Sequence, residues 1–249
     1  QKYIIIICHL LQLLCMPRYK LTIEYDGGPY IGWQRQKIGL SVQGVLENAG
    51  KKLNHNKPVE VYGSGRTDSG VHALAQIAHM DLNKEYGTDK IRDAMNFHMA
   101  SDPVTILKAE VVSDDWHARF DAIERRYLYR VIDRRMKLSL DKGRVWRVPV
   151  KLNEDTMHQA AQYLVGQHDF TTFRDTQCQA KSPTKTIDAI TITRVEEEIH
   201  FHFRARSFLH KQVRSMVGSL IEVGLGKQEQ YAIKKMLDGK KRTLCGPVA

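Results

Sequence analysis

Apolar and polar side chains alternate one for one between residues 18 and 25, and this alternation is the sequence feature that most restricts the possible fold. The apolar members are Tyr19, Leu21, Ile23 and Tyr25. A period of two is typical of a strand with one buried and one open face. The run ends at the turn signal Asp26-Gly27-Gly28-Pro29. The regular structure therefore begins with a half-buried strand, which indicates a sheet-based fold.

Helices and further strands follow in the first half. Apolar residues recur at helical spacing from Val42 to Leu53, and Ser41 precedes them, which predicts an amphipathic helix with a serine N-cap. Other predicted elements are strands at 59–62, 75–80 and 105–112 and a helix at 88–98.

The second half repeats this plan loosely. Strands are predicted at 126–132, 143–150, 186–195 and 199–205. Two helices are predicted, one carrying Met157, Ala160, Ala161 and Leu164 and closed by Gly166, and a closing one carrying Leu209, Val213, Met216, Val217 and Leu220 and ending near Gly224. The pattern predicts an α+β fold with two similar subdomains, each a mostly antiparallel sheet covered by helices. We expect an extended central sheet with a catalytic cleft between the subdomains.

Residues 1–15 are mostly apolar, carry one formal charge at Lys2 and run into Met16. A signal peptide would carry a clear basic start and a small-residue cleavage site, and neither is evident. We therefore expect 1–15 to be a non-native leader outside the fold. The N-terminal subdomain is expected at 16–113 and the C-terminal subdomain at 114–249.

The composition is that of a globular chain, with 42% hydrophobic residues and a net charge of +10. An excess of cations of this size favours a polyanionic partner such as nucleic acid over a merely basic surface. No stretch reaches the roughly 20 apolar residues of a membrane-spanning helix, which predicts a cytoplasmic protein. Cys178 and Cys245 stand far apart with no CxxC, which predicts a reducing compartment and neither a zinc site nor a redox pair.

The most unusual local chemistry lies between Tyr62 and Ala73. Three glycines within eight residues permit backbone conformations that other residues resist, and Arg66 and Asp68 place one cation and one anion between them. The pattern is not a P-loop, because GxxxxGK[ST] is absent. From the residues alone, a surface turn rich in turn-forming side chains is the alternative.

The segment Gly65-Arg66-Thr67-Asp68-Ser69-Gly70-Val71-His72-Ala73 resembles the signature of the tRNA pseudouridine synthase A family, bacterial-type enzymes that isomerise uridine in the anticodon stem-loop. Other segments agree in order: Tyr25-Asp26-Gly27, Gly32-Trp33-Gln34-Arg35-Gln36, Val42-Gln43, His117-Ala118-Arg119-Phe120, Arg126-Tyr127-Leu128-Tyr129, Gly166-Gln167-His168-Asp169-Phe170 and Phe208 to Gly218. The family's Leu-Pro pair has no match in the segment 95–103, and its final strand is expected beyond Ala249.

The resemblance implies a tRNA-modifying isomerase that acts on uridines 38, 39 and 40 as a homodimer, without cofactor or metal. It implies that Asp68 is the catalytic carboxylate and that Arg66 assists base flipping. Tyr127 would stack on the target uracil, and Leu209 and Val213 would wall the pocket. Arg214 is the cation expected beside Asp68, where it would keep the carboxylate ionised.

Residue chemistry leaves several alternatives open. Asp68 could attack C6 of the base, attack C1′ of the ribose, or remove a ribose proton, and all three need an ionised carboxylate. Arg214 shares a helix face with Gly218 and Ile221, which predicts a half-buried arginine close to another backbone, with a solvated charge as the alternative. Tyr127 could instead pack in the core beside Tyr129.

Other functions are weighed against this one. A non-catalytic RNA-binding protein would have no use for a buried acid facing RNA, and an aspartate-dependent hydrolase rests on the lone carboxylate. His200 and His202 share one strand face but offer too few ligands for a metal, which favours surface histidines.

Overall fold

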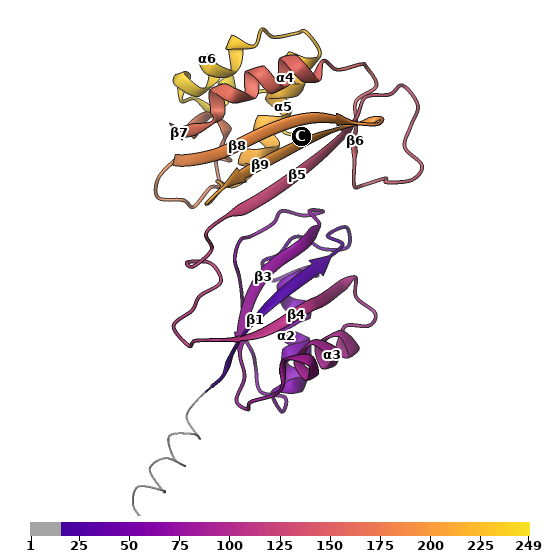
Figure 1. The fold of residues 1–249 in the computed structure, drawn as a ribbon, viewed down its shortest axis with the longest axis vertical. Coiled ribbons are helices and arrows are strands. Elements are labelled where there is room, and N and C mark those ends of the chain that lie inside the picture. The colour runs from indigo at the N-terminus through magenta and orange to yellow at the C-terminus, as the bar shows by residue number, and fades with distance from the viewer. Residues whose placement is uncertain (1–15) are drawn as a thin grey trace, which may run out of the picture. The chain divides into compact units, whose positions relative to one another are not determined.

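The computed structural model describes residues 16–249, so the predicted leader at 1–15 lies outside the described residues. The chain divides into two compact units, of which the first ends at Ala122 and the second begins at Ile123. Both units combine a sheet with helices (Figure 1), which makes the chain an α+β protein.

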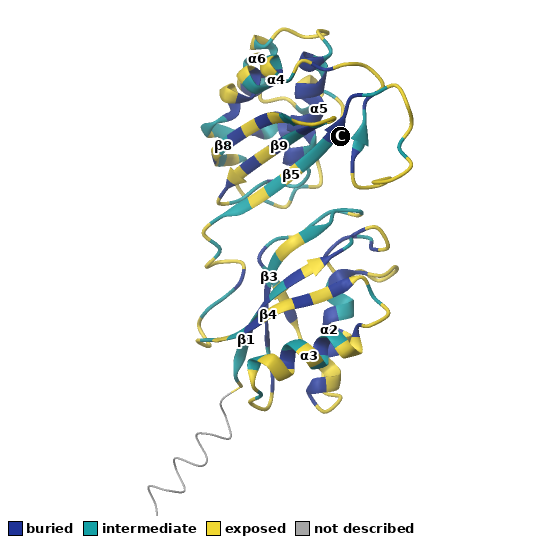
Figure 2. Cartoon of the chain, turned by 45° about the vertical axis from the view of Figure 1, so that its right-hand side comes forward, coloured by how far each residue is buried: buried dark blue, intermediate teal, exposed yellow. Residues whose placement is uncertain are grey.

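A four-stranded antiparallel sheet forms the first unit, in the order β2-β3-β1-β4. Its strands are β1 (Arg18–Tyr25), β2 (Val61–Gly63), β3 (Ala73–Asp81) and β4 (Val104–Val112). The helices α2 (Val42–Leu53) and α3 (Thr88–His98) lie on one side of this sheet (Figure 2). One sheet face is therefore covered by helices, and residues 116–118 cover part of the other face, at His79.

The sequence pattern explains this packing directly. The four apolar residues of β1 are at most 2% exposed and join the core, as the alternation predicted. The Ser41 side chain accepts a hydrogen bond from the Gly44 amide, which confirms the predicted N-cap of α2. Only β2 is shorter than the predicted strand at 59–62. It begins at Val61, and Val59 is buried although it lies before the strand.

A five-stranded sheet forms the second unit, in the order β6-β5-β9-β8-β7. Its strands are β5 (Arg125–Ile132), β6 (Trp146–Arg147), β7 (Gly166–Asp169), β8 (Thr184–Val195) and β9 (Glu198–Ala205). Only β5 and β6 pair in parallel. The helices α4 (Glu154–Ala161), α5 (Gln212–Gly224) and α6 (Tyr231–Gly239) pack on one side of this sheet (Figure 2).

Three predictions in this unit were wrong. The strand expected at 143–150 shrinks to β6, because Asp141 and Gly143 adopt positive φ and turn the chain just before it. Gly166 opens strand β7 instead of closing a helix, since α4 ends at Ala161 and a short 3-10 turn buries Leu164. The helix α5 is not the last one, because α6 follows it.

An ion-pair network around the buried Asp133 joins the end of β5 to β8 and to the start of α4. The Arg194 guanidinium donates to Asp133 at 2.9 Å and to Glu154 at 2.8 Å, and the Leu152 amide also donates to Asp133. Burial alone would raise the pKa of Asp133. The hydrogen bonds from Arg194, Leu152 and Lys151 outweigh burial and lower that pKa to about 2.

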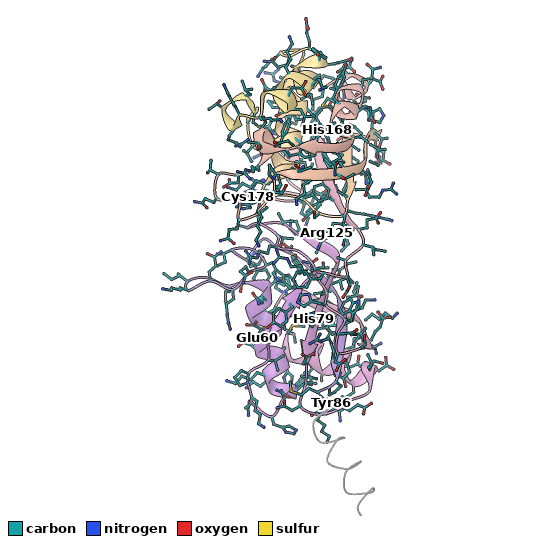
Figure 3. All side chains as sticks on the ribbon, turned by 90° about the vertical axis from the view of Figure 1, so that its left-hand side faces the viewer. Glu60, His79, Tyr86, Arg125, His168 and Cys178 are labelled. Carbon is teal, nitrogen blue, oxygen red and sulfur yellow. The ribbon has the colours of Figure 1, made fainter. Side chains whose placement is uncertain are left out.

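His79 on β3 is a second buried titratable group (Figure 3). Its Nδ1 accepts the Ala118 amide at 3.2 Å, so the neutral ring carries its proton on Nε2. Burial first, and then the charges of Arg18 and His117, lower the pKa of His79 to about 4.

Within the described residues, no helix is long and apolar enough to cross a membrane.

Candidate active site

The carboxylate loop, residues 64–72, connects β2 to β3 in the first unit. Asp68 and Thr67 are half-buried in it, and Arg66 is exposed. At its start the chain packs closely against the Trp33 ring, so a Cβ atom added at Gly63 would lie 2.5 Å from that ring. Glycine is therefore required where the loop leaves β2.

The residue before Asp68 is held on two sides by the segment that follows β1. The Tyr25 hydroxyl is hydrogen-bonded to Thr67 Oγ1 at 2.9 Å, and the Trp33 amide donates to the Thr67 carbonyl at 3.1 Å. Gly32, at φ +121°, makes this approach possible, since a Cβ there would lie 2.6 Å from the same carbonyl oxygen. The backbone that carries Asp68 is thus preorganised.

Both ends of the carboxylate loop are also fixed. The Gln76 amide group donates to the Gly65 carbonyl at 2.7 Å. At the other end the Gly27 amide donates to His72 Nδ1 at 3.1 Å, and a Cβ at Gly27 would lie 2.0 Å from the Val71 carbonyl oxygen. His72 therefore has a structural contact, and Asp68 lies between two anchored ends.

Sequence reasoning missed this clamp. In the sequence, Tyr25 ends the alternating strand, Gly27 belongs to the turn signal after it, and Gly32 and Trp33 belong to a segment of the family resemblance. The available signal was the placement of glycines beside large aromatics, which is typical of close backbone approach. That signal names no partner, so the contact with Thr67 could not be predicted from it.

In the second unit, Arg214 lies in the first turn of α5 and is half-buried. Its Nε donates to the Ala249 carbonyl at 2.6 Å, and the Ala249 amide returns a hydrogen bond to the Arg214 carbonyl. A Cβ at Gly218 would lie 1.7 Å from the Pro247 carbonyl oxygen. The predicted half-buried arginine beside a close backbone is confirmed, and that backbone is the segment 247–249.

The other predicted pocket residues gather around the same helix end. Leu209 and Val213 are 5% and 8% exposed and belong to the core of this unit, against which Tyr127 packs. The half-buried Tyr127 ring meets Phe208 edge-to-face at 5.2 Å. Tyr127, Leu209 and Val213 thus belong to one hydrophobic cluster. Leu209 and Val213 are also close to Arg214 in the sequence. Asp68 and Arg66 belong to the first unit, and the Asp68–Arg214 pair stays a prediction.

The turn into α5 contains a strained residue. Lys211 has left-handed backbone angles, with φ +56°, directly before the helix begins. Its ammonium donates to Asp175 at 2.7 Å and lowers the pKa of that carboxyl, while the Asp175 amide donates to the His210 carbonyl. Asp175 therefore holds the turn that leads to Val213 and Arg214, a role that no local pattern around Asp175 predicts.

Metal-ligating groups are scattered in the part of the chain that the structure describes. No cluster of three or more His, Cys, Asp or Glu residues there could hold a metal ion. His200 contacts Glu198 at 2.9 Å and His202 is exposed, in keeping with surface histidines. Cys178 and Cys245 are free thiols, and Cys178 is marked in Figure 3.

Comparison with known proteins identifies the family of this chain as one of isomerases. A family model described as tRNA pseudouridine synthase matches residues 21–121 and 160–249. The chain belongs to the tRNA pseudouridine synthase family, a family of isomerases.

Curated relatives are similar over almost the whole chain. The tRNA pseudouridine synthase A of Maricaulis maris is 62% identical over 234 residues, which cover 94% of each chain. The proteins of the same name from Rhodopseudomonas palustris and Parvibaculum lavamentivorans are 56% and 54% identical, over 94% of this chain and 95% of theirs.

Proposed function

We propose that this chain isomerises uridine to pseudouridine in the anticodon stem-loop of tRNA, at positions 38, 39 and 40, in the cytoplasm and without a cofactor. The observation that carries the proposal is the loop around Asp68, whose residues match the family signature and whose backbone is clamped through Thr67. A carboxylate on a fixed backbone is suited to a reaction in which the catalytic group must keep its position while the base turns.

The reaction is balanced without any added atom. The N1–C1′ bond of uridine breaks, the uracil turns, and a C5–C1′ bond forms, while the hydrogen on C5 leaves as a proton and N1 gains one. The Asp68 side chain would act on the nucleotide while the base is detached. No redox step is involved, so no electron carrier is required.

The second-unit cluster has the chemistry to hold the turning base. A Tyr127 ring can stack on uracil in any orientation, and Leu209 and Val213 offer an apolar wall beside it. Arg214 would lie close to Asp68 and offer it a positive charge. Because a stem uridine must leave its stack first, exposed Arg66 would fill the vacated space or hold a phosphate.

This assignment needs the two units to act together. We propose that they are similar subdomains that form an extended sheet with a catalytic cleft between them, since the carboxylate and the pocket cluster lie in different units. The supporting feature is the shared plan of an antiparallel sheet with helices on one side.

A homodimer is the proposed working unit. An L-shaped tRNA is longer than a 28.6 kDa globule is wide, so one subunit holding the anticodon stem could not also reach the elbow. Two symmetric subunits could divide these tasks. Light scattering at micromolar protein should report about twice the chain mass, and a fully active monomer at every concentration would contradict the proposal.

The activity is tested with an unmodified tRNA transcript carrying tritium at C5 of uridine. Substitution at C5 must eject the label, so the proposal predicts tritium in water and no free uracil. Release of free uracil would indicate a hydrolase, and tight tRNA binding without any tritium release would indicate a non-catalytic binder.

A further inference from the structure

The net positive charge of this chain comes from the second unit. Residues 123–249 contain 24 Lys and Arg against 14 Asp and Glu, a net charge of +10. Residues 1–122 contain 14 of each and are neutral. Because a polyanion is attracted by the local excess of cations, the second unit carries the electrostatic attraction for RNA.

Most of that excess lies in one stretch of the second unit. Between residues 125 and 151 there are ten Lys and Arg but only two acids, Asp133 and Asp141, a net charge of +8. The stretch comprises β5, the connection to β6, and the residues just after β6. It also falls within residues 122–159, which the family model leaves unmatched. The match to the family model therefore does not include this stretch.

The connection between β5 and β6 presents cations to solvent. Residues 133–145 form a long loop that extends past the end of β5 (Figure 1). Arg135, Lys137 and Lys142 are exposed, and among the described residues no salt bridge with an acidic side chain includes them. Asp141 instead lies 3.8 Å from Arg130. The three cations thus keep their charge available to a ligand.

The basic loop, residues 134–147, is also held in shape. The Arg147 guanidinium donates to the Arg135 carbonyl at 3.0 Å, and the Arg134 guanidinium pairs with Glu197 at 2.8 Å. The Arg144 amide donates to the Asp141 carbonyl in a turn that Gly143 completes at φ +88°. A fixed array of cations loses less conformational freedom on binding than a free tail does.

We propose that the basic loop binds the sugar-phosphate backbone of the RNA substrate outside the target nucleotide, through Arg135, Lys137 and Lys142. The inference rests on the proposed function, because it takes the RNA to be the tRNA substrate. Solvent-exposed cations can bind phosphate oxygens. Such contacts position an RNA but do not depend directly on its base sequence. The loop therefore contributes affinity and register, and the chemistry stays with Asp68.

The test replaces these three residues together, as Arg135→Gln, Lys137→Gln and Lys142→Gln. The control is Lys57→Gln, Lys84→Gln and Lys90→Gln, which removes the same charge from exposed positions of the neutral first unit. The dissociation constant for unmodified tRNA is measured at several salt concentrations. Each lost phosphate contact should reduce the log–log salt slope by about 0.7–0.9. We expect a slope reduction of about two, affinity about tenfold weaker at low salt, and unchanged kcat at saturating tRNA.

Several results would overturn the proposal. An unchanged slope in the loop variant, or an equal change in the control, would place the contacts elsewhere. A change in mass by light scattering with an unchanged slope would make the loop a contact between copies. Loss of binding to anionic vesicles with tRNA affinity intact would make it a lipid site. If the parent releases no tritium, the proposed function fails separately, and the salt slope still decides the role of the loop.

Discussion

Gly32→Ala should disable the Asp68 loop without unfolding the protein. The added Cβ would lie 2.6 Å from the Thr67 carbonyl oxygen, whereas real contacts of this kind are rarely shorter than 3.0 Å. The Thr67 carbonyl must therefore retreat by about 0.5 Å, which breaks its alignment with the Trp33 amide. Because Asp68 is the next residue, its carboxylate moves too, and a misplacement approaching 1 Å can reduce turnover by about 100-fold.

The same substitution also strains the backbone, and this cost must be separated from the displacement. Alanine at φ +121° costs about 1–3 kcal/mol of stability. Gly226→Ala is the matched control, because Gly226 has φ +71° and a Cβ there would meet nothing within 4 Å. Both variants should lose similar free energy of unfolding in urea.

Only Gly32→Ala should lose turnover, which is measured as tritium release at saturating tRNA and at a temperature where both variants are folded. We expect kcat about 10–100-fold below the parent for Gly32→Ala and near the parent for Gly226→Ala. Full kcat in Gly32→Ala would refute the argument that the Thr67 contact positions Asp68.

Three further predictions follow from individual groups. Arg214→Met should lower tritium release, because Asp68 would lose the cation expected beside it; full activity of this variant across neutral pH would exclude the pairing. Asp175→Ala should lower kcat by about tenfold, and adding Lys211→Gly should restore it, since glycine adopts left-handed angles without the ion pair; no rescue would show that the lysine charge matters instead. Stability should fall in two acid steps in urea titrations at different pH. The pKa of His79 is lowered from 6.5 to about 4, so the unfolded chain takes up this proton more readily, and about 3 kcal/mol of stability is lost as the pH falls between those values. The pKa of Asp133 is lowered from 3.8 to about 2, so about 2 kcal/mol of stability is lost as the pH falls below 4, a step that Asp133→Asn should remove.

The fold was predictable where one periodic pattern controlled one element. The alternation of β1 and the capped apolar face of α2 depend on local residues only, and both agree with the structure. The nine-residue helix α6 was missed, because only Ile233 and Leu237 are fully buried in it. The strand expected at 143–150 failed because turn geometry at Asp141 and Gly143 overrode its apolar residues.

The site was predictable as a set of residues and unpredictable as a set of contacts. The motif around Asp68 and the helix spacing of Arg214 are visible in the sequence. The bond from Trp33 to Thr67 and the ion pair of Asp175 with Lys211 join segments more than 30 residues apart. No local pattern encodes such a pair, so tertiary structure was needed to find the groups that hold the site.

The most direct test of the account is the Asp68→Asn variant, with Asp114→Asn as the control for an exposed carboxylate of the same unit. The amide keeps the size of the side chain but can act neither as a nucleophile nor as a base. The account predicts that Asp68→Asn binds unmodified tRNA within about tenfold of the parent and releases no tritium from C5-labelled uridine, while Asp114→Asn releases it at the parental rate. Appreciable tritium release by Asp68→Asn would contradict the account.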